Sequence, residues 1–167
     1  MPRHLTILPF VLAAACARSE DRPAASAPPA DPPPKTAPAP TESWVEVDPA
    51  QPLARTLADE AAAATRAGKK PHAYLHADWC PPCVEIGKTR DQPKMKAAFA
   101  GTHIIAIDVD RVDPKQVEAA GLKSSVLPIF YRLDDHGRPT GATIDGGAWG
   151  DNIPDNMAPP LAAFFAK

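Results

Sequence analysis

The pattern of apolar and polar positions divides most of the chain into helices and strands. An alanine-rich stretch at residues 48–70 predicts a helix, because alanine favours helix and a proline and a glycine stand near its two ends. Residues 71–77, "PHAYLHA", predict a short strand that leads into Cys80 and Cys83. The stretch "THIIAIDVD" at residues 102–110 is β-branched and almost continuously apolar, which is typical of a buried parallel strand.

Short helices are predicted between and after these strands. The segment that follows Cys83 is helical in two pieces, because Pro93 begins the second piece and Gly101 ends it. A further brief helix at residues 113–121 has Asp113 at its N-cap.

The carboxyl-terminal part of the chain predicts a hairpin and a closing helix. Two apolar segments within residues 126–147 flank the turn "DDHG", which is typical of an antiparallel hairpin. Residues 146–160 are rich in glycine, proline and asparagine and predict a loop, in which Trp149 would either cap the core or contact a partner. Residues 156–167, "NMAPPLAAFFAK", predict a closing helix, whose apolar face would comprise Leu161, Phe164 and Phe165.

The order of elements is therefore helix, strand, helix, strand, helix, strand, strand, helix. A βαβ half followed by a ββα half predicts an α/β fold with a central mixed sheet of about four strands flanked by helices. We place this single domain at residues 44–167 of the 167-residue chain. The net charge of -2 indicates no basic patch, so we expect no nucleic acid among the partners.

The first residues have a different character and predict a secretory signal peptide at residues 1–16. A basic start at Arg3 precedes an apolar run that is too short to remain in a bilayer as a spanning helix. The run ends in "LAAAC", which resembles a bacterial lipobox, although Ala13 stands where such sequences usually have leucine. Ordinary cleavage after the alanines is the competing interpretation. We favour lipidation of Cys16, because the odd cysteine would otherwise be a free thiol.

A tether is predicted to follow at residues 17–43. Its central part, residues 23–40, contains almost only proline, alanine and a few polar residues. Such a segment buries too little apolar surface to offset its ordering entropy, so we expect a disordered, extended spacer. The domain would then be exported, periplasmic in a bacterium, and attached to the membrane through a lipid on Cys16. Disulfide chemistry is possible in such a compartment.

Several motifs together resemble the thioredoxin superfamily over about residues 52–167: "YLHADWCPPC", "AIDVD" and "VLPIFYRLDDHGRPTG". Among its branches the chain is most similar to exported thioredoxin-like domains, including the periplasmic C-terminal domain of transmembrane disulfide reductases. The resemblance implies a thioredoxin-like fold and a thiol–disulfide oxidoreductase that uses neither a cofactor nor a metal. It also implies protein thiols and disulfides as partners, with a membrane electron donor as the source of reductant.

The resemblance also assigns roles to single residues. Cys80 would attack as a thiolate stabilised by the start of a helix, and Cys83 would resolve the mixed disulfide. Pro128 matches the family's cis-proline, beside which the backbone of Leu127 pairs with an extended substrate segment. Trp79 would form an apolar wall of the same substrate groove.

The dipeptide between the cysteines indicates the direction of the chemistry. Neither Pro81 nor Pro82 has an N–H to offer the Cys80 sulfur, so the thiolate should be less stabilised than in sites with other dipeptides. A less stabilised thiolate makes the dithiol a better electron donor. We therefore expect a domain on the reducing or isomerising side.

Tyr74 departs from the family pattern. Many thioredoxins have a buried acid six residues before the first cysteine, where it accepts the proton of the resolving thiol. A phenol with a normal pKa of about 10 is a poor base at neutral pH. The proton would leave through water, a neighbour such as Asp78 or Glu85 would substitute, or resolution would be slow.

Three other interpretations of the cysteine pair were weighed. Zinc needs four ligands and the pair supplies two, but His72 and His76 lie on one face of the same strand, so a copper- or metal-handling chaperone is an alternative. A structural disulfide would contribute little, because the loop it closes is short. A non-catalytic binding module on the same scaffold is a further alternative.

Overall fold

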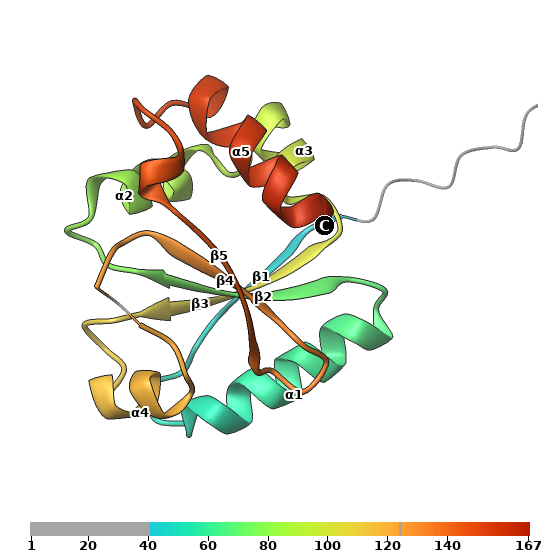
Figure 1. Ribbon diagram of the computed structural model, residues 1–167, viewed down its shortest axis with the longest axis vertical. Coiled ribbons are helices and arrows are strands. Elements are labelled where there is room, and N and C mark those ends of the chain that lie inside the picture. The colour runs from blue at the N-terminus through green and yellow to red at the C-terminus, as the bar shows by residue number, and fades with distance from the viewer. Residues whose placement is uncertain (1–40, 124) are drawn as a thin grey trace, which may run out of the picture. The chain divides into compact units, whose positions relative to one another are not determined.

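The computed structural model describes residues 41–123 and 125–167 (Figure 1). The predicted signal peptide, the proposed lipidation of Cys16 and residues 17–40 of the predicted tether lie outside the described residues. Within the described part of the chain, no helix is both long enough and apolar enough to cross a membrane.

The centre of the structure is a five-stranded mixed sheet with the strand order β1-β3-β2-β4-β5. Strands β1, β3 and β2 are parallel to each other, whereas β4 is antiparallel to both β2 and β5. The strands are β1 (Ser43–Glu46), β2 (Lys70–His76), β3 (Thr102–Asp108), β4 (Ile129–Leu133) and β5 (Pro139–Asp145). The predicted count of about four strands omitted β1, because four residues directly after a proline-rich segment carry no periodicity of their own.

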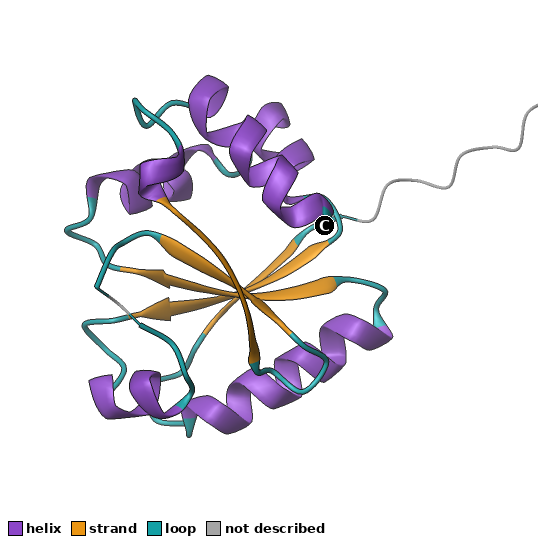
Figure 2. Cartoon of the chain, viewed as in Figure 1, coloured by secondary structure: helices purple, strands orange, loops and turns teal. Residues whose placement is uncertain are grey.

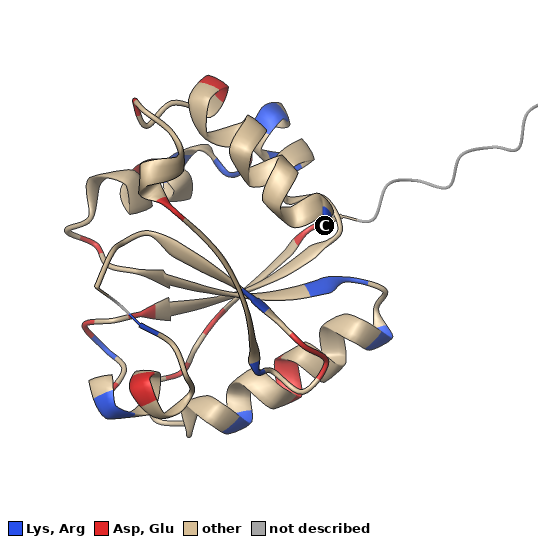
Figure 3. Ribbon diagram, in the orientation of Figure 1, with Lys and Arg blue, Asp and Glu red and all other residues tan. Residues whose placement is uncertain are grey.

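Helices cover both faces of the sheet, as Figures 1 and 2 show: α2, α3 and α5 on one face, α1 and α4 on the other. The helices are α1 (Leu53–Arg66), α2 (Pro81–Thr89), α3 (Pro93–Phe99), α4 (Pro114–Ala119) and α5 (Pro154–Ala166), with a short 3-10 helix at Gly146–Ala148. Lysine, arginine, aspartate and glutamate lie mainly on helices, turns and strand ends, with the two signs interspersed (Figure 3).

Helix α5 begins at Pro154, two residues before the predicted closing helix at 156–167. Residues 156–160 belong to both the predicted loop and the predicted helix; they are helical, and Pro159 and Pro160 lie inside the helix. Met157, Leu161 and Phe165 are spaced four residues apart and all three are buried, so they form one apolar stripe against the sheet. Packing of this stripe outweighs the local cost of the prolines.

Two apolar cores result, one on each side of the sheet. Along β3, Ile104 and Ala106 face the core under α2, α3 and α5, and Ile105 and Ile107 face the core over α1 and α4. Trp149 belongs to the first core: it is 8% exposed and its Nε1–H donates to Asn152 Oδ1 at 3.0 Å. This tryptophan therefore caps the core.

His72, on β2, is completely buried in the first core. Its ring lies edge-on to Phe164 and Phe165, and its Nδ1 is 3.0 Å from the backbone oxygen of Lys70. Burial disfavours the imidazolium and lowers the pKa of His72 from 6.5 to about 4.

The first prediction concerns acid stability. Between pH 6.5 and about 4 the unfolded imidazole binds a proton that the buried one does not, so the free energy of unfolding falls as the pH falls through this window. The contribution of His72 to this loss should reach roughly 3 kcal/mol. Urea unfolding at several pH values should show that His72→Leu removes this part of the acid sensitivity, whereas substitution of the exposed His136 leaves it unchanged. Parallel pH profiles for the wild-type chain and His72→Leu would contradict the assignment.

The β4–β5 hairpin turn packs directly on the backbone of α1. Gly137, in this turn, has a φ of +77°, and a Cβ at this position would lie 2.5 Å from the carbonyl carbon and oxygen of Leu57. Gly141, in β5, has a φ of +89°, but no atom lies within 4 Å of a Cβ there. The two glycines thus share a backbone conformation that disfavours L side chains but differ in their surroundings.

The second prediction separates these two effects. Gly141→Ala should cost about 1–2 kcal/mol of unfolding free energy from its backbone conformation alone. Gly137→Ala should cost at least about 2 kcal/mol more, because the hairpin must move away from α1. Chemical denaturation of both variants measures the difference, and equal losses would show that the turn does not need this contact.

Candidate dithiol active site

The two neighbouring cysteines lie where the central strand β2 passes into helix α2. The strand ends at His76, and Cys80 is the N-cap residue of α2 with extended backbone angles. The carboxyl ends of parallel strands are where α/β sheets commonly place their functional groups. A turn of only a few residues therefore holds the two cysteines at the carboxyl end of the central strand.

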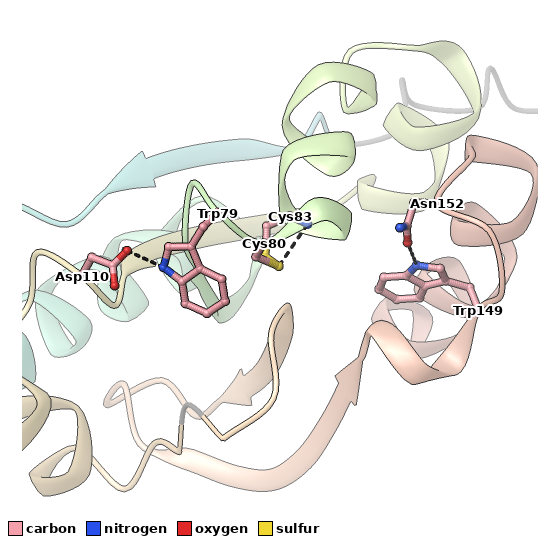
Figure 4. Close-up of a disulfide and its surroundings, with 6 residues drawn as sticks. All are labelled: Trp79, Cys80, Cys83, Asp110, Trp149 and Asn152. Carbon is pink, nitrogen blue, oxygen red and sulfur yellow. Dashed lines mark hydrogen bonds between the residues drawn. A yellow bond between two sulfur atoms is a disulfide. The ribbon is translucent and has the colours of Figure 1, made fainter.

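Cys80 and Cys83 form a disulfide, with an S–S distance of 2.11 Å and a Cα–Cα distance of 5.2 Å (Figure 4). Both residues belong to a small apolar cluster with Ala77, against which Leu127 and Val109 pack. Cys80 is 2% exposed and Cys83 is 6% exposed. Cys83 is slightly the more accessible of the two and borders a surface pocket.

The start of α2 offers the Cys80 sulfur a single backbone donor. The N–H of Cys83 points at the sulfur over 3.4 Å. Pro81 and Pro82 occupy the first two helical positions and have no N–H. An N-cap side chain normally accepts from the second or third helical N–H, so Pro82 removes one of the two usual donors.

Leu127 packs against the cysteine pair, and the peptide bond from Leu127 to Pro128 is cis. The backbone oxygen of Pro128 accepts a hydrogen bond from the N–H of Gly146 at 3.1 Å. This bond joins the start of β4 to the end of β5, so the segment beside the cysteines is fixed at both strands.

Trp79 stands in solvent at the same edge, with 67% of the residue exposed. Its Nε1–H donates to Asp110 Oδ2 at 2.7 Å, which holds the indole in place (Figure 4). Val126, just before Leu127, is also exposed, at 47%. Two apolar side chains that face solvent beside a disulfide offer a contact surface for another molecule.

Cys83 also lines a pocket of about 350 Å³ between α2 and the ends of β1 and β2. Tyr74 lines it and stacks on Phe130 at 4.4 Å between ring centroids and on His76 at 5.0 Å. Burial raises the pKa of Tyr74 well above its usual value, so the phenol keeps its proton. Glu46, on β1, also lines this pocket, and sequence analysis missed it together with its strand.

The other candidate acids lie differently. Asp78 lines the same pocket from the turn after β2 and is exposed. Glu85 is turned to its own helix, where Lys88 Nζ donates to it at 2.8 Å, and it does not line the pocket. Of the two neighbours named from the sequence, only Asp78 borders the space next to Cys83.

His72 and His76 lie on one side of β2, as predicted, but they do not act as a pair. His72 is enclosed by α5, and His76 borders the pocket beside Cys83. Over the described residues, no group of three or more histidine, cysteine, aspartate or glutamate side chains could hold a metal ion.

Comparisons with known proteins concern the fold. No family model matches the chain, and no curated protein matches it. The structure of a disulphide isomerase from Xylella fastidiosa is similar, with a TM-score of 0.54 and 22% identity over 72% of this chain and 93% of that one. A thioredoxin pre-protein from Schistosoma mansoni has a TM-score of 0.46 and 16% identity over 73% of this chain and 98% of that one. The chain has the thioredoxin-like α/β fold predicted from its sequence.

The third prediction tests the missing donor at the start of α2. Pro82→Ala restores an N–H that can reach the Cys80 sulfur, and a hydrogen bond to a charged group contributes about 1.5–3 kcal/mol. The pKa of the Cys80 thiol in the reduced protein should therefore fall by about one unit. Pro81→Ala is the matched control, because the first helical N–H does not point at the N-cap side chain. Titration of thiolate absorbance distinguishes the two variants, and equal shifts would refute the explanation.

Proposed function

We propose that this protein is an extracytoplasmic thiol–disulfide oxidoreductase that reduces or isomerises disulfides of other proteins. The observation that carries the proposal is the Cys80–Cys83 disulfide at the start of α2, packed against Leu127 and directly preceded in the chain by the exposed Trp79. A disulfide that closes so short a loop contributes little to stability, which favours a redox-active disulfide over a structural one.

The reaction transfers two electrons from the dithiol to a substrate disulfide. The Cys80 thiolate attacks one substrate sulfur, a bond forms between them, and the other substrate sulfur leaves as a thiolate that takes up a proton. Cys83 then loses its proton and attacks Cys80, which forms the intramolecular disulfide and releases the first substrate sulfur. Isomerisation uses the first step and its reversal and leaves the dithiol reduced.

Surface features around the disulfide suit a protein substrate. Trp79 and Val126 offer apolar contacts in solvent, and Leu127 packs against the cysteine pair, where we expect its backbone to pair with an extended substrate segment. Pro82 leaves the Cys80 thiolate with one backbone donor, and a less stabilised thiolate favours reduction of the substrate disulfide by the dithiol. Return to the dithiol form needs an external dithiol, for which we propose a membrane electron donor, and a lipid on Cys16 would keep the domain at that membrane.

The fourth prediction is a trapping experiment with the full chain in its own cells. Cys83→Ser removes the resolving thiol, so Cys80 should remain joined to its substrates as mixed disulfides that non-reducing gels separate and mass spectrometry identifies. The matched control is the double variant Cys80→Ser, Cys83→Ser, which should capture nothing. If Cys83→Ser alkylates normally at Cys80 but captures no protein, a binding module would replace the proposed oxidoreductase.

A further inference from the structure

The second half of the proposed reaction requires that Cys83 lose a proton, and the structure lacks the usual acceptor. Tyr74 occupies the position six residues before Cys80, and its buried phenol keeps its own proton. A buried thiol without a base nearby ionises slowly, because burial disfavours the thiolate. The proton must therefore leave by the side on which Cys83 is accessible.

That side is the pocket of about 350 Å³. A pocket of this size holds several water molecules, each needing roughly 30 Å³ of liquid volume. Cys83 lines it on the α2 side, whereas His76 and Glu46 line it from β2 and β1. A water path can thus join the resolving cysteine to an imidazole and a carboxylate.

His76 and Glu46 form a hydrogen bond across the intervening strand β3. The distance between His76 Nε2 and Glu46 Oε2 is 3.4 Å, and the two side chains are 17% and 64% exposed. Ala106 of β3 pairs with Glu46 on one side and with Tyr74 on the other, and its small side chain leaves room above the strand. The His76 ring also stacks on Tyr74 at 17° between ring planes, so its orientation is fixed.

The charges support an exchange of protons at His76. The hydrogen bond from His76 lowers the pKa of Glu46 below its usual value, with Arg90 adding to the effect, so the carboxylate stays ionised. An ionised carboxylate only accepts, so Nε2 carries the hydrogen of the neutral ring and Nδ1 is left to take another. The other titratable or charged groups around the pair are Tyr74, Asp78, Lys88, Asp108 and Arg111.

We propose that His76 accepts the proton of Cys83 through pocket water during resolution, and that Glu46 positions and stabilises the resulting imidazolium. The proposal rests on the oxidoreductase function above. The proton passes from Cys83 Sγ to water and on to His76 Nδ1. The Cys83 thiolate attacks Cys80 Sγ, the new S–S bond forms, and the bond from Cys80 to the substrate breaks with its electron pair on the substrate sulfur. The imidazolium then returns the proton to solvent.

The fifth prediction follows from this route. Reduced full-length protein is mixed with an excess of oxidised insulin as a model protein disulfide, quenched with acid at short times and analysed by mass for the mixed disulfide. His76→Gln should slow resolution near pH 7 by at least about tenfold, since positioned acid–base groups contribute about 10²–10⁴-fold. The mixed disulfide should therefore accumulate, while the initial attack by Cys80 keeps its rate. Above about pH 9 the variant should approach the wild-type rate, because hydroxide then removes the thiol proton.

Two further variants sharpen the test. Glu46→Gln, at an exposed side chain, should retain part of the rate and move the acid limb of the pH profile of resolution to lower pH, because the imidazolium loses the carboxylate that stabilises it. His103→Gln is the matched control, because His103 pairs with Glu60 at 2.8 Å and is 12% exposed, but does not line the pocket. This variant should resolve as the wild-type protein does.

The outcomes separate the two proposals. If the wild-type protein forms no mixed disulfide and does not reduce insulin, the oxidoreductase function fails. If the mixed disulfide forms and His76→Gln resolves it with the wild-type pH profile, the function stands and the role of His76 is refuted. Loss of resolution in Asp78→Asn but not in His76→Gln would likewise refute it and assign the proton to Asp78.

Discussion

The geometry of the cysteine site depends on the junction between strand β2 and helix α2. The strand lies in the middle of the sheet, between β3 and β4, and its side chains are buried by helices on both faces. Such a strand cannot shift without loss of both cores, so the turn that follows it starts from a fixed point. Cys80 is therefore held in place as the N-cap residue of α2, and Leu127, which directly precedes Pro128 and β4, packs against the cysteine pair.

The fold could be predicted because its signals are local and agree with one another. The continuous apolar run of β3, the turn between β4 and β5 and the cysteine spacing each specify one element. Strand β1 was missed because its four residues are a strand only through their pairing with β3, some sixty positions later in the chain. The predicted loop and the predicted closing helix overlap at residues 156–160 for a similar reason, since prolines there are tolerated in a helix only where Met157 and Leu161 pack on the sheet.

The candidate site divides in the same way. Its sulfur half is contiguous in sequence, so spacing alone indicated Cys80 and Cys83, and the resemblance indicated Pro128. Its acid–base half is assembled from separate elements: His76 and Glu46 are thirty positions apart and meet only across strand β3, where Glu46 pairs with Ala106 and His76 pairs with Asp108. No sequence motif predicts this contact, and the sequence indicated His76 only as a possible metal ligand. Glu46 could have been found from the sequence only by predicting strand β1 and then considering the carboxylate that it carries.

The position of Glu46 at the end of an edge strand has a consequence for local unfolding. Strand β1 lies at the edge of the sheet and pairs only with β3, over four residues. Short edge strands with few pairing partners open at lower free energy than central ones. Fraying of β1 would move the Glu46 carboxylate away from His76, while helix α2 and the disulfide at its N-terminus stay folded. The two halves of the site therefore have different lifetimes, and a pull on the amino-terminal segment would act on the first before the second.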